Sequence, residues 1–139
     1  MEELTTKATI ENITAVTEFV RGKLDALNCP RRIKVQIDIA IDELFGNIAR
    51  YAYASGEGPA TVRVEVKQHP TSVVITFIDH GVPFDPLASA DPDITLSAQA
   101  RRIGGLGIFM VKKSMDDITY EYKDGMNILS IHKHLPSDD

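Results

Sequence analysis

The chain has 139 residues, 43% of them hydrophobic and 25% charged, and its formal net charge is −5. Such a length and composition are typical of one soluble globular domain, so we expect a single domain over residues 1–139. No run of Lys and Arg exceeds two residues, which argues against direct binding of nucleic acid or of an anionic membrane. No apolar run approaches the roughly 18 residues of a membrane span, and the N-terminus lacks the basic start and apolar core of a signal peptide. Together with the single cysteine, Cys29, these features predict a cytoplasmic protein.

The hydrophobic pattern predicts alternating groups of helices and strands. The expected elements, in chain order, are a strand at 7–11, helices at 12–27 and 30–54, strands at 60–69 and 71–79, a helix at 106–116 and a strand hairpin at 117–135. Residues 80–103 hold three prolines and show no sustained period, and an irregular segment of this length is usually functional or disordered. The order predicts an α+β fold, with a mixed, mostly antiparallel sheet and helices packed on one face.

The segment IDELFGNIARYAY, residues 41–53, places two polar side chains on one face of the longer helix. Glu43 and Asn47 are four residues apart and therefore share that face. The face lies beside the apolar stripe of the helix, which consists of Ile33, Ile37, Ile41, Leu44 and Ile48. A carboxylate there can accept a proton, and a carboxamide oxygen can bind a hard cation such as Mg²⁺. Taken alone, the pair also fits a solvated glutamate beside an asparagine that bonds locally. Asp42 adjoins Glu43, but the four-residue spacing to Asn47 favours Glu43 as the functional carboxylate.

Asp79 stands where the strand at 71–79 passes into the irregular segment, in the sequence DHGVPFDP. A carboxylate at this point can accept a hydrogen bond from an exocyclic amine such as N6 of adenine, and Gly81 gives the turn its freedom. The alternative is an ordinary turn in which the carboxylate bonds to its own backbone.

Three glycines, Gly104, Gly105 and Gly107, precede an apolar helix in GGLGIFMVKKSMD. The chain contains neither a GxxxxGK[ST] segment nor a complete dinucleotide fingerprint, so neither motif explains them. A glycine-rich approach to a helix N-terminus suits phosphate, because the free N–H groups and the helix dipole favour an anion. Arg102, just before the glycines, can add a charge-assisted contact. A hinge that binds no ligand is the alternative.

In this order, the three segments resemble the motifs of the Bergerat-fold ATPases, the GHKL or histidine kinase-like superfamily, over about residues 8–134. The resemblance is strongest to the small anti-sigma factor serine/threonine kinases, to whose motifs DELFGNIARYAY, DHGVPFDP and GGLGIFMVKKSMD are similar. It implies a two-layer α/β sandwich, the Bergerat ATP-binding fold, with a long ATP lid at about residues 86–103.

The resemblance also implies roles for individual residues. Glu43 would activate the attacking group, Asn47 would hold Mg²⁺, and Asp79 would bind the adenine amine. Pro83 departs from the second glycine of D-x-G-x-G, although proline followed by phenylalanine is common in the anti-sigma branch, and Tyr51 stands where a histidine is frequent. The late hydroxyl residue that touches phosphate in some relatives falls loosely on residue 130. The implied nucleotide contacts are Asn47, Tyr51, Asp79, Gly81, Pro83, Phe84, Arg102, Gly104, Gly105, Leu106, Gly107 and Ser130.

The resemblance further implies a protein serine kinase that uses ATP and Mg²⁺ to phosphorylate a STAS-domain anti-sigma antagonist. The same protein would sequester a sigma factor when its antagonist is phosphorylated, and relatives suggest a homodimer. A non-catalytic module that binds its partner under the control of nucleotide is the alternative, although the presence of Glu43 argues against it. A histidine kinase catalytic domain is a further reading, but the sequence shows no dimerisation helix with a phospho-accepting histidine.

Overall fold

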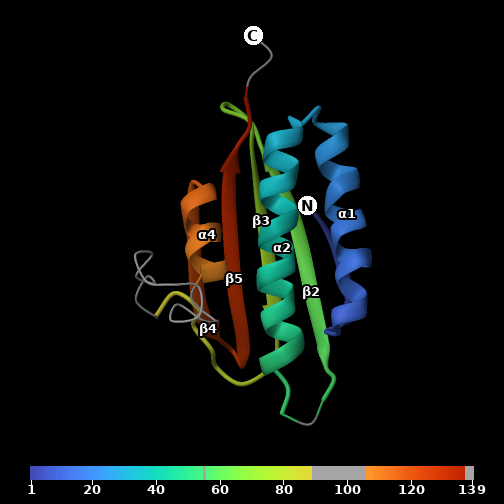
Figure 1. The fold of residues 1–139 in the computed structure, drawn as a ribbon, viewed down its shortest axis with the longest axis vertical. Coiled ribbons are helices and arrows are strands. Elements are labelled where there is room, and N and C mark those ends of the chain that lie inside the picture. The colour runs from blue at the N-terminus through green and yellow to red at the C-terminus, as the bar shows by residue number, and fades with distance from the viewer. Residues whose placement is uncertain (55, 89–105, 137–139) are drawn as a thin grey trace.

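A five-stranded sheet with helices on one face forms the body of the protein (Figure 1). The computed structural model describes residues 1–54, 56–88 and 106–136. The helices are η1 (Ile10–Asn12, a single 3₁₀ turn), α1 (Ile13–Ala26), α2 (Arg31–Tyr51) and α4 (Leu106–Ser114). The strands are β1 (Glu2–Lys7), β2 (Pro59–Lys67), β3 (Ser72–Asp79), β4 (Asp117–Lys123) and β5 (Met126–His134). The predicted α+β architecture is confirmed, and in the described ranges no helix is long and apolar enough to cross a membrane.

The strands follow the order β1-β2-β3-β5-β4, and every pairing among the described residues is antiparallel. The parallel pairing that a mixed sheet would include is therefore absent from the described part of the chain. Asp79, at the end of β3, is directly opposite Asn127 of β5. Directly opposed residues of an antiparallel pair point to the same face, so the register brings these two polar side chains together at one end of the sheet.

Strand alternation determines which face of the sheet the helices cover. In β2, the side chains of Ala60, Val62 and Val64 are buried, whereas the residues between them are partly exposed. α1 and α2 lie over this face, and α2 contacts both α1 and α4 (Figure 1). The apolar stripe predicted for α2 is the part of that helix that packs on the sheet. An amphipathic helix turns its apolar stripe toward the core and its polar side toward solvent. Its fully buried members are Ile33, Ile37, Ile41 and Leu44.

The strand expected at 7–11 is wrong in its position. β1 covers Glu2–Lys7 instead, and Ile10–Asn12 form the 3₁₀ turn η1. The error has a physical cause: β1 is an edge strand, and the polar residues that edge strands carry weaken the apolar alternation. Asn12 occupies the N-cap position of α1, and its side-chain amide donates to the Lys7 carbonyl oxygen at 2.9 Å rather than capping the helix.

The closing hairpin forms as the sequence predicts. β4 and β5 are joined by Asp124 and Gly125, whose φ angles are 54° and 76°. Two successive residues with positive φ match the right-handed twist of the flanking strands, and Asp-Gly is a preferred pair for such a turn. The hairpin fixes the position of β5, which carries part of the site described next.

Candidate functional site

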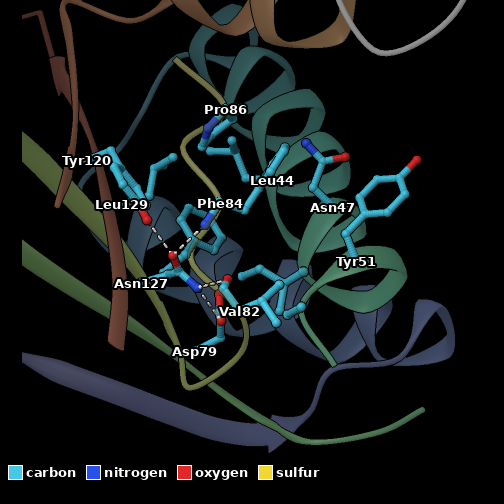
Figure 2. Close-up of a pocket in the computed structure, with 13 residues that line it drawn as sticks. Leu44, Asn47, Tyr51, Asp79, Val82, Phe84, Pro86, Tyr120, Asn127 and Leu129 are labelled. Atoms are coloured by element: carbon cyan, nitrogen blue, oxygen red, sulfur yellow. Dashed lines mark hydrogen bonds between the residues drawn. The ribbon is translucent and has the colours of Figure 1, made fainter. Parts of the chain in front are cut away.

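A pocket opens where β3 ends and β5 begins, between the sheet and the C-terminal half of α2 (Figure 2). The space between its walls, including the part that is open to solvent, is about 440 Å³. The walls are mostly apolar and carry a few polar groups, a composition that suits a flat heteroaromatic base. The lining residues are Leu44, Asn47, Ile48, Tyr51, Ala52, Phe77, Asp79, Val82, Phe84, Pro86, Tyr120, Asn127 and Leu129.

Asp79 lies at the inner end of the pocket and is only 4% exposed. Its Oδ1 accepts hydrogen bonds from the Gly81 backbone N–H, at 2.8 Å, and from the Asn127 side-chain amide, at 2.9 Å. No hydrogen bond from the described residues goes to Oδ2, so this oxygen is left to accept from a ligand. The ordinary turn that the sequence allowed is thus present at Oδ1, and it leaves half of the carboxylate for binding.

Asn127 belongs to the pocket, although the motifs do not mark it. Its side chain is 6% exposed and donates to Asp79 and, at 2.8 Å, to the Val82 carbonyl oxygen. Its Oδ1 accepts from the Phe84 backbone N–H at 3.1 Å and from the Tyr120 hydroxyl at 2.5 Å (Figure 2). One amide therefore joins β3, β4, β5 and the segment after β3, with both donors and both acceptor positions in use.

A sequence signal for Asn127 does exist. On β5 it shares a face with Leu129 and Ile131, which are buried in the core. An amide at the end of a buried apolar row must find hydrogen-bond partners, because an unpaired buried polar group is costly. The pattern therefore indicates a buried polar contact at residue 127, but not the residue that it contacts.

The segment after β3 is docked on the C-terminal end of α2. The Val82 backbone N–H donates to the Ala52 carbonyl oxygen at 2.9 Å. A Cβ at Gly81 would lie 2.6 Å from the Ala52 carbonyl carbon and closer still to its oxygen. Gly81 has no room for a side chain because the two backbones meet here. This close approach keeps the turn that carries Asp79 next to α2.

Tyr53 holds the same turn from the side of β2. Its hydroxyl donates to the Pro59 carbonyl oxygen at 2.5 Å and accepts from the His80 backbone N–H at 2.9 Å. Burial raises the pKa of the Tyr53 phenol, against a smaller opposing effect of the hydrogen bond from His80. The proton that makes the bond to Pro59 is thus retained across the neutral range.

Two aromatic rings stand at the mouth of the pocket. Tyr51 and Phe84 both line it, with ring centroids 6.2 Å apart and ring planes inclined by 44°. Their side chains are 55% and 46% exposed, so each presents π surface to an incoming ligand. Pro83, which precedes Phe84, is exposed to solvent and does not line the pocket.

Glu43 and Asn47 lie together at the edge of the pocket, next to α4. The Asn47 amide nitrogen is 3.5 Å from Oε1 of Glu43, a long hydrogen bond, and Asn47 also lines the pocket. The Glu43 carboxylate is packed against Gly107 in the first turn of α4. Asp42 is exposed to solvent, whereas Glu43 is partly buried, so the position of Glu43 matches the role that the spacing favours.

The remaining predicted contacts divide into two groups. Arg102, Gly104 and Gly105, with residues 89–103 of the expected lid, lie outside the described residues, and Leu106 begins α4. Ser130, by contrast, is placed on the opposite face of the sheet from the pocket, where its hydroxyl bonds to that of Thr76 at 2.9 Å. The structure therefore does not bring Ser130 to the pocket, because its neighbours on the strand face the helices and alternation turns Ser130 away.

Comparisons with known proteins agree with this fold. The sequence matches the family model of the histidine kinase-like ATPase domain over residues 6–133. It is 26% identical over 103 residues to the serine/threonine-protein kinase BtrW of Bordetella bronchiseptica, covering 74% of this chain and 72% of that protein. It is 28% identical over 97 residues to the serine-protein kinase RsbW of Listeria monocytogenes, covering 67% of this chain and 61% of that protein.

The fold is also found in a solved structure. A chain in the crystal structure of the SiaB–SiaC complex from Pseudomonas aeruginosa is similar with a TM-score of 0.58 at 17% sequence identity. The similarity covers 95% of this chain and 89% of that chain, which supports the fold alone. Because the family model matches nearly the whole length of this chain, the chain belongs to the histidine kinase-like ATPase domain family, as its motifs predicted.

Proposed function

We propose that the protein is an ATP-dependent protein serine kinase in which Glu43 and Asn47 carry the chemistry. The observation that supports this most directly is their position: Asn47 lines the pocket that Asp79 closes, and Glu43 lies beside Asn47 and against the first turn of α4. Membership of the ATPase family implies that ATP is the nucleotide, and the relatives BtrW and RsbW are named as protein kinases.

The residues of the pocket fit a bound ATP. The free Oδ2 of Asp79 would accept a hydrogen bond from the adenine amine, and the Tyr51 and Phe84 rings would cover the base. Asn47 has an amide oxygen to offer Mg²⁺, a hard cation that prefers oxygen ligands. The N-terminus of α4 favours the negative charge of the phosphates.

When bound, Mg²⁺-ATP supplies the phosphoryl group, and the protein's task is to position and deprotonate the acceptor. Glu43 would accept the proton of a serine hydroxyl as the bond from that oxygen to the γ-phosphorus forms and the bond to ADP breaks. Asn47 would hold Glu43 in place through its amide nitrogen and would bind the metal ion through its amide oxygen. The helix N-terminus would stabilise charge on the phosphoryl group during transfer.

We extend the proposal to the partners that the motifs imply. The acceptor serine would lie in a STAS-domain anti-sigma antagonist, and the kinase would bind a sigma factor once that antagonist is phosphorylated. A homodimer in the cytoplasm is the proposed working form. The resemblance of the three motifs to the anti-sigma kinases supports this extension, together with the kinase names of the relatives.

Transfer of labelled phosphate from ATP to purified STAS-domain proteins tests the proposal. A general base contributes about 10²–10⁴-fold, so Glu43→Ala should slow transfer by that factor while the Kd of ATP stays within about threefold. Asp42→Ala, which removes the exposed neighbouring carboxylate, is the matched control and should transfer at the wild-type rate. If the wild-type protein binds ATP tightly yet phosphorylates no serine, the non-catalytic module is the better description.

A further inference from the structure

Gly107 meets the Glu43 carboxylate more closely than any other residue type could. A Cβ placed on Gly107 would lie 2.5 Å from Oε1 of Glu43 and closer still to Cδ and Oε2. A Cβ atom essentially never comes within 3.0 Å of a heavy atom outside its own residue and its chain neighbours, so the carboxylate fills the space that a side chain would need. Gly22, in α1, is different, because a Cβ there would meet nothing within 4 Å.

Backbone conformation does not explain the glycine at this position. Gly107 lies in α4 and has no positive φ, so an alanine could adopt the same backbone. Glycine weakens a helix relative to alanine, and α4 has only nine residues. The contact with Glu43 is what the missing side chain makes possible.

We propose that Gly107 is a positioning residue for Glu43: its bare backbone leaves the place in which the carboxylate rests. Asn47 approaches the same carboxylate from α2, with its amide nitrogen 3.5 Å from Oε1. The carboxylate is therefore held between its own helix and the first turn of α4. This role differs from the phosphate contact that the motif implies for the same glycine.

A methyl group at residue 107 would displace the carboxylate rather than the helices. The atoms that it would meet are at the far end of the Glu43 side chain, which can rotate away without moving either helix but gives up its contact with Asn47 when it does. The fold should survive Gly107→Ala, and the damage should fall on the orientation of Glu43. The consequence for phosphoryl transfer rests on the proposed function, but the contact itself does not.

Thermal unfolding without nucleotide tests the contact by a double-mutant cycle. In the Glu43→Ala background the new methyl group has room, and Gly107→Ala should raise the Tm by about 3–6 °C, the ordinary gain of alanine over glycine in a helix. With Glu43 present, this gain should shrink by at least about 3 °C or be reversed. Gly22→Ala, the matched control, should shift the Tm equally in both backgrounds. Equal shifts for Gly107→Ala would overturn the proposal whether or not the protein is a kinase.

Single-turnover transfer then separates positioning from phosphate binding. Gly107→Ala should slow transfer at saturating ATP by at least about tenfold while the Kd of ATP changes less than about threefold. The penalty should be much smaller in the Glu43→Asp background, because the shorter side chain withdraws the carboxylate from the methyl group. A weaker Kd with an unchanged saturated rate would overturn the positioning role in favour of a phosphate contact. If the wild-type protein transfers no phosphate, the proposed function fails, and the inference about Gly107 is decided by the Tm cycle.

Discussion

Asn127→Asp is the sharpest test of the hydrogen-bond network at the inner end of the pocket, because the two side chains have the same shape. The wild-type amide donates to Oδ1 of Asp79 at 2.9 Å and to the Val82 carbonyl oxygen at 2.8 Å. A carboxylate has no N–H to donate, so the substitution turns both hydrogen bonds into contacts between acceptors. It also places two carboxylates side by side at positions that are 4% and 6% exposed in the wild-type protein.

The expected magnitude follows from these contacts. Two hydrogen bonds at about 0.5–1.5 kcal/mol each, together with the repulsion of the carboxylates, should lower the free energy of unfolding by about 2–4 kcal/mol at neutral pH. For a domain of this size the Tm should fall by about 8–16 °C. The neighbouring carboxylate raises the pKa of the introduced carboxyl group in the folded state above its unfolded value of about 3.9. Part of the lost stability is therefore regained as the pH falls toward about 4, because the protonated group ends the repulsion and can donate one of the two hydrogen bonds.

Thermal unfolding between about pH 4 and 7 measures this, with ATP affinity measured in parallel. Ser130→Ala is the matched control, since it removes one hydrogen bond on the same strand but on the opposite face of the sheet. It should cost about 1 kcal/mol and leave ATP affinity unchanged. A Tm of Asn127→Asp no lower than that of Ser130→Ala, or a loss of stability that does not change with pH, would refute the network as we describe it.

Two further predictions concern groups around the same pocket. Asp79→Asn should weaken the binding of adenine nucleotides by about 10–100-fold, which corresponds to the loss of a charge-assisted hydrogen bond of about 1.5–3 kcal/mol. Calorimetry that shows an unchanged Kd would exclude Asp79 as the acceptor for the adenine amine. Burial raises the pKa of Tyr53 and of Tyr120 above the ordinary value of 10.0, so the unfolded chain loses these protons first as the pH rises. Their contribution to stability is complete below about pH 10 and is lost above it. The fall in Tm above about pH 10 should therefore be smaller in Tyr53→Phe and in Tyr120→Phe than in the wild-type protein. An identical fall would contradict the role of burial.

Much of the fold could be predicted because it depends on local patterns. The stripe of α2, the alternation of β2 and β3 and the Asp-Gly turn before β5 are each written within a few neighbouring residues. The pair Glu43 and Asn47 is local in the same sense, since a helix places residues four apart on one face. Such signals do not require knowledge of which elements become neighbours.

The contacts that could not be predicted are those that depend on pairing between distant strands. Asn127 meets Asp79 because β5 pairs with β3 in one register, and a shift by one residue would turn Asn127 to the other face. The same alternation removes Ser130 from the pocket, although as a hydroxyl residue near the end of the chain it resembled a phosphate ligand. The alignment of motifs identified the right strand, but the register determines which of its residues faces the site.

Two glycines of the motifs contact α2, and the atoms that they meet give them different functions. Gly81 lies against the backbone of Ala52, which cannot move without unwinding the end of the helix, so its lack of a side chain supports the shape of the pocket. Gly107 lies against the end of the flexible Glu43 side chain, which can move, so its lack of a side chain supports an orientation rather than the fold. A substitution at the first position should therefore lower stability more than one at the second, whose main effect should fall on the chemistry proposed for Glu43. In the proposed kinase, α2 thus joins the part of the site that binds the base to the part that carries Glu43, and a glycine from another segment packs against each part.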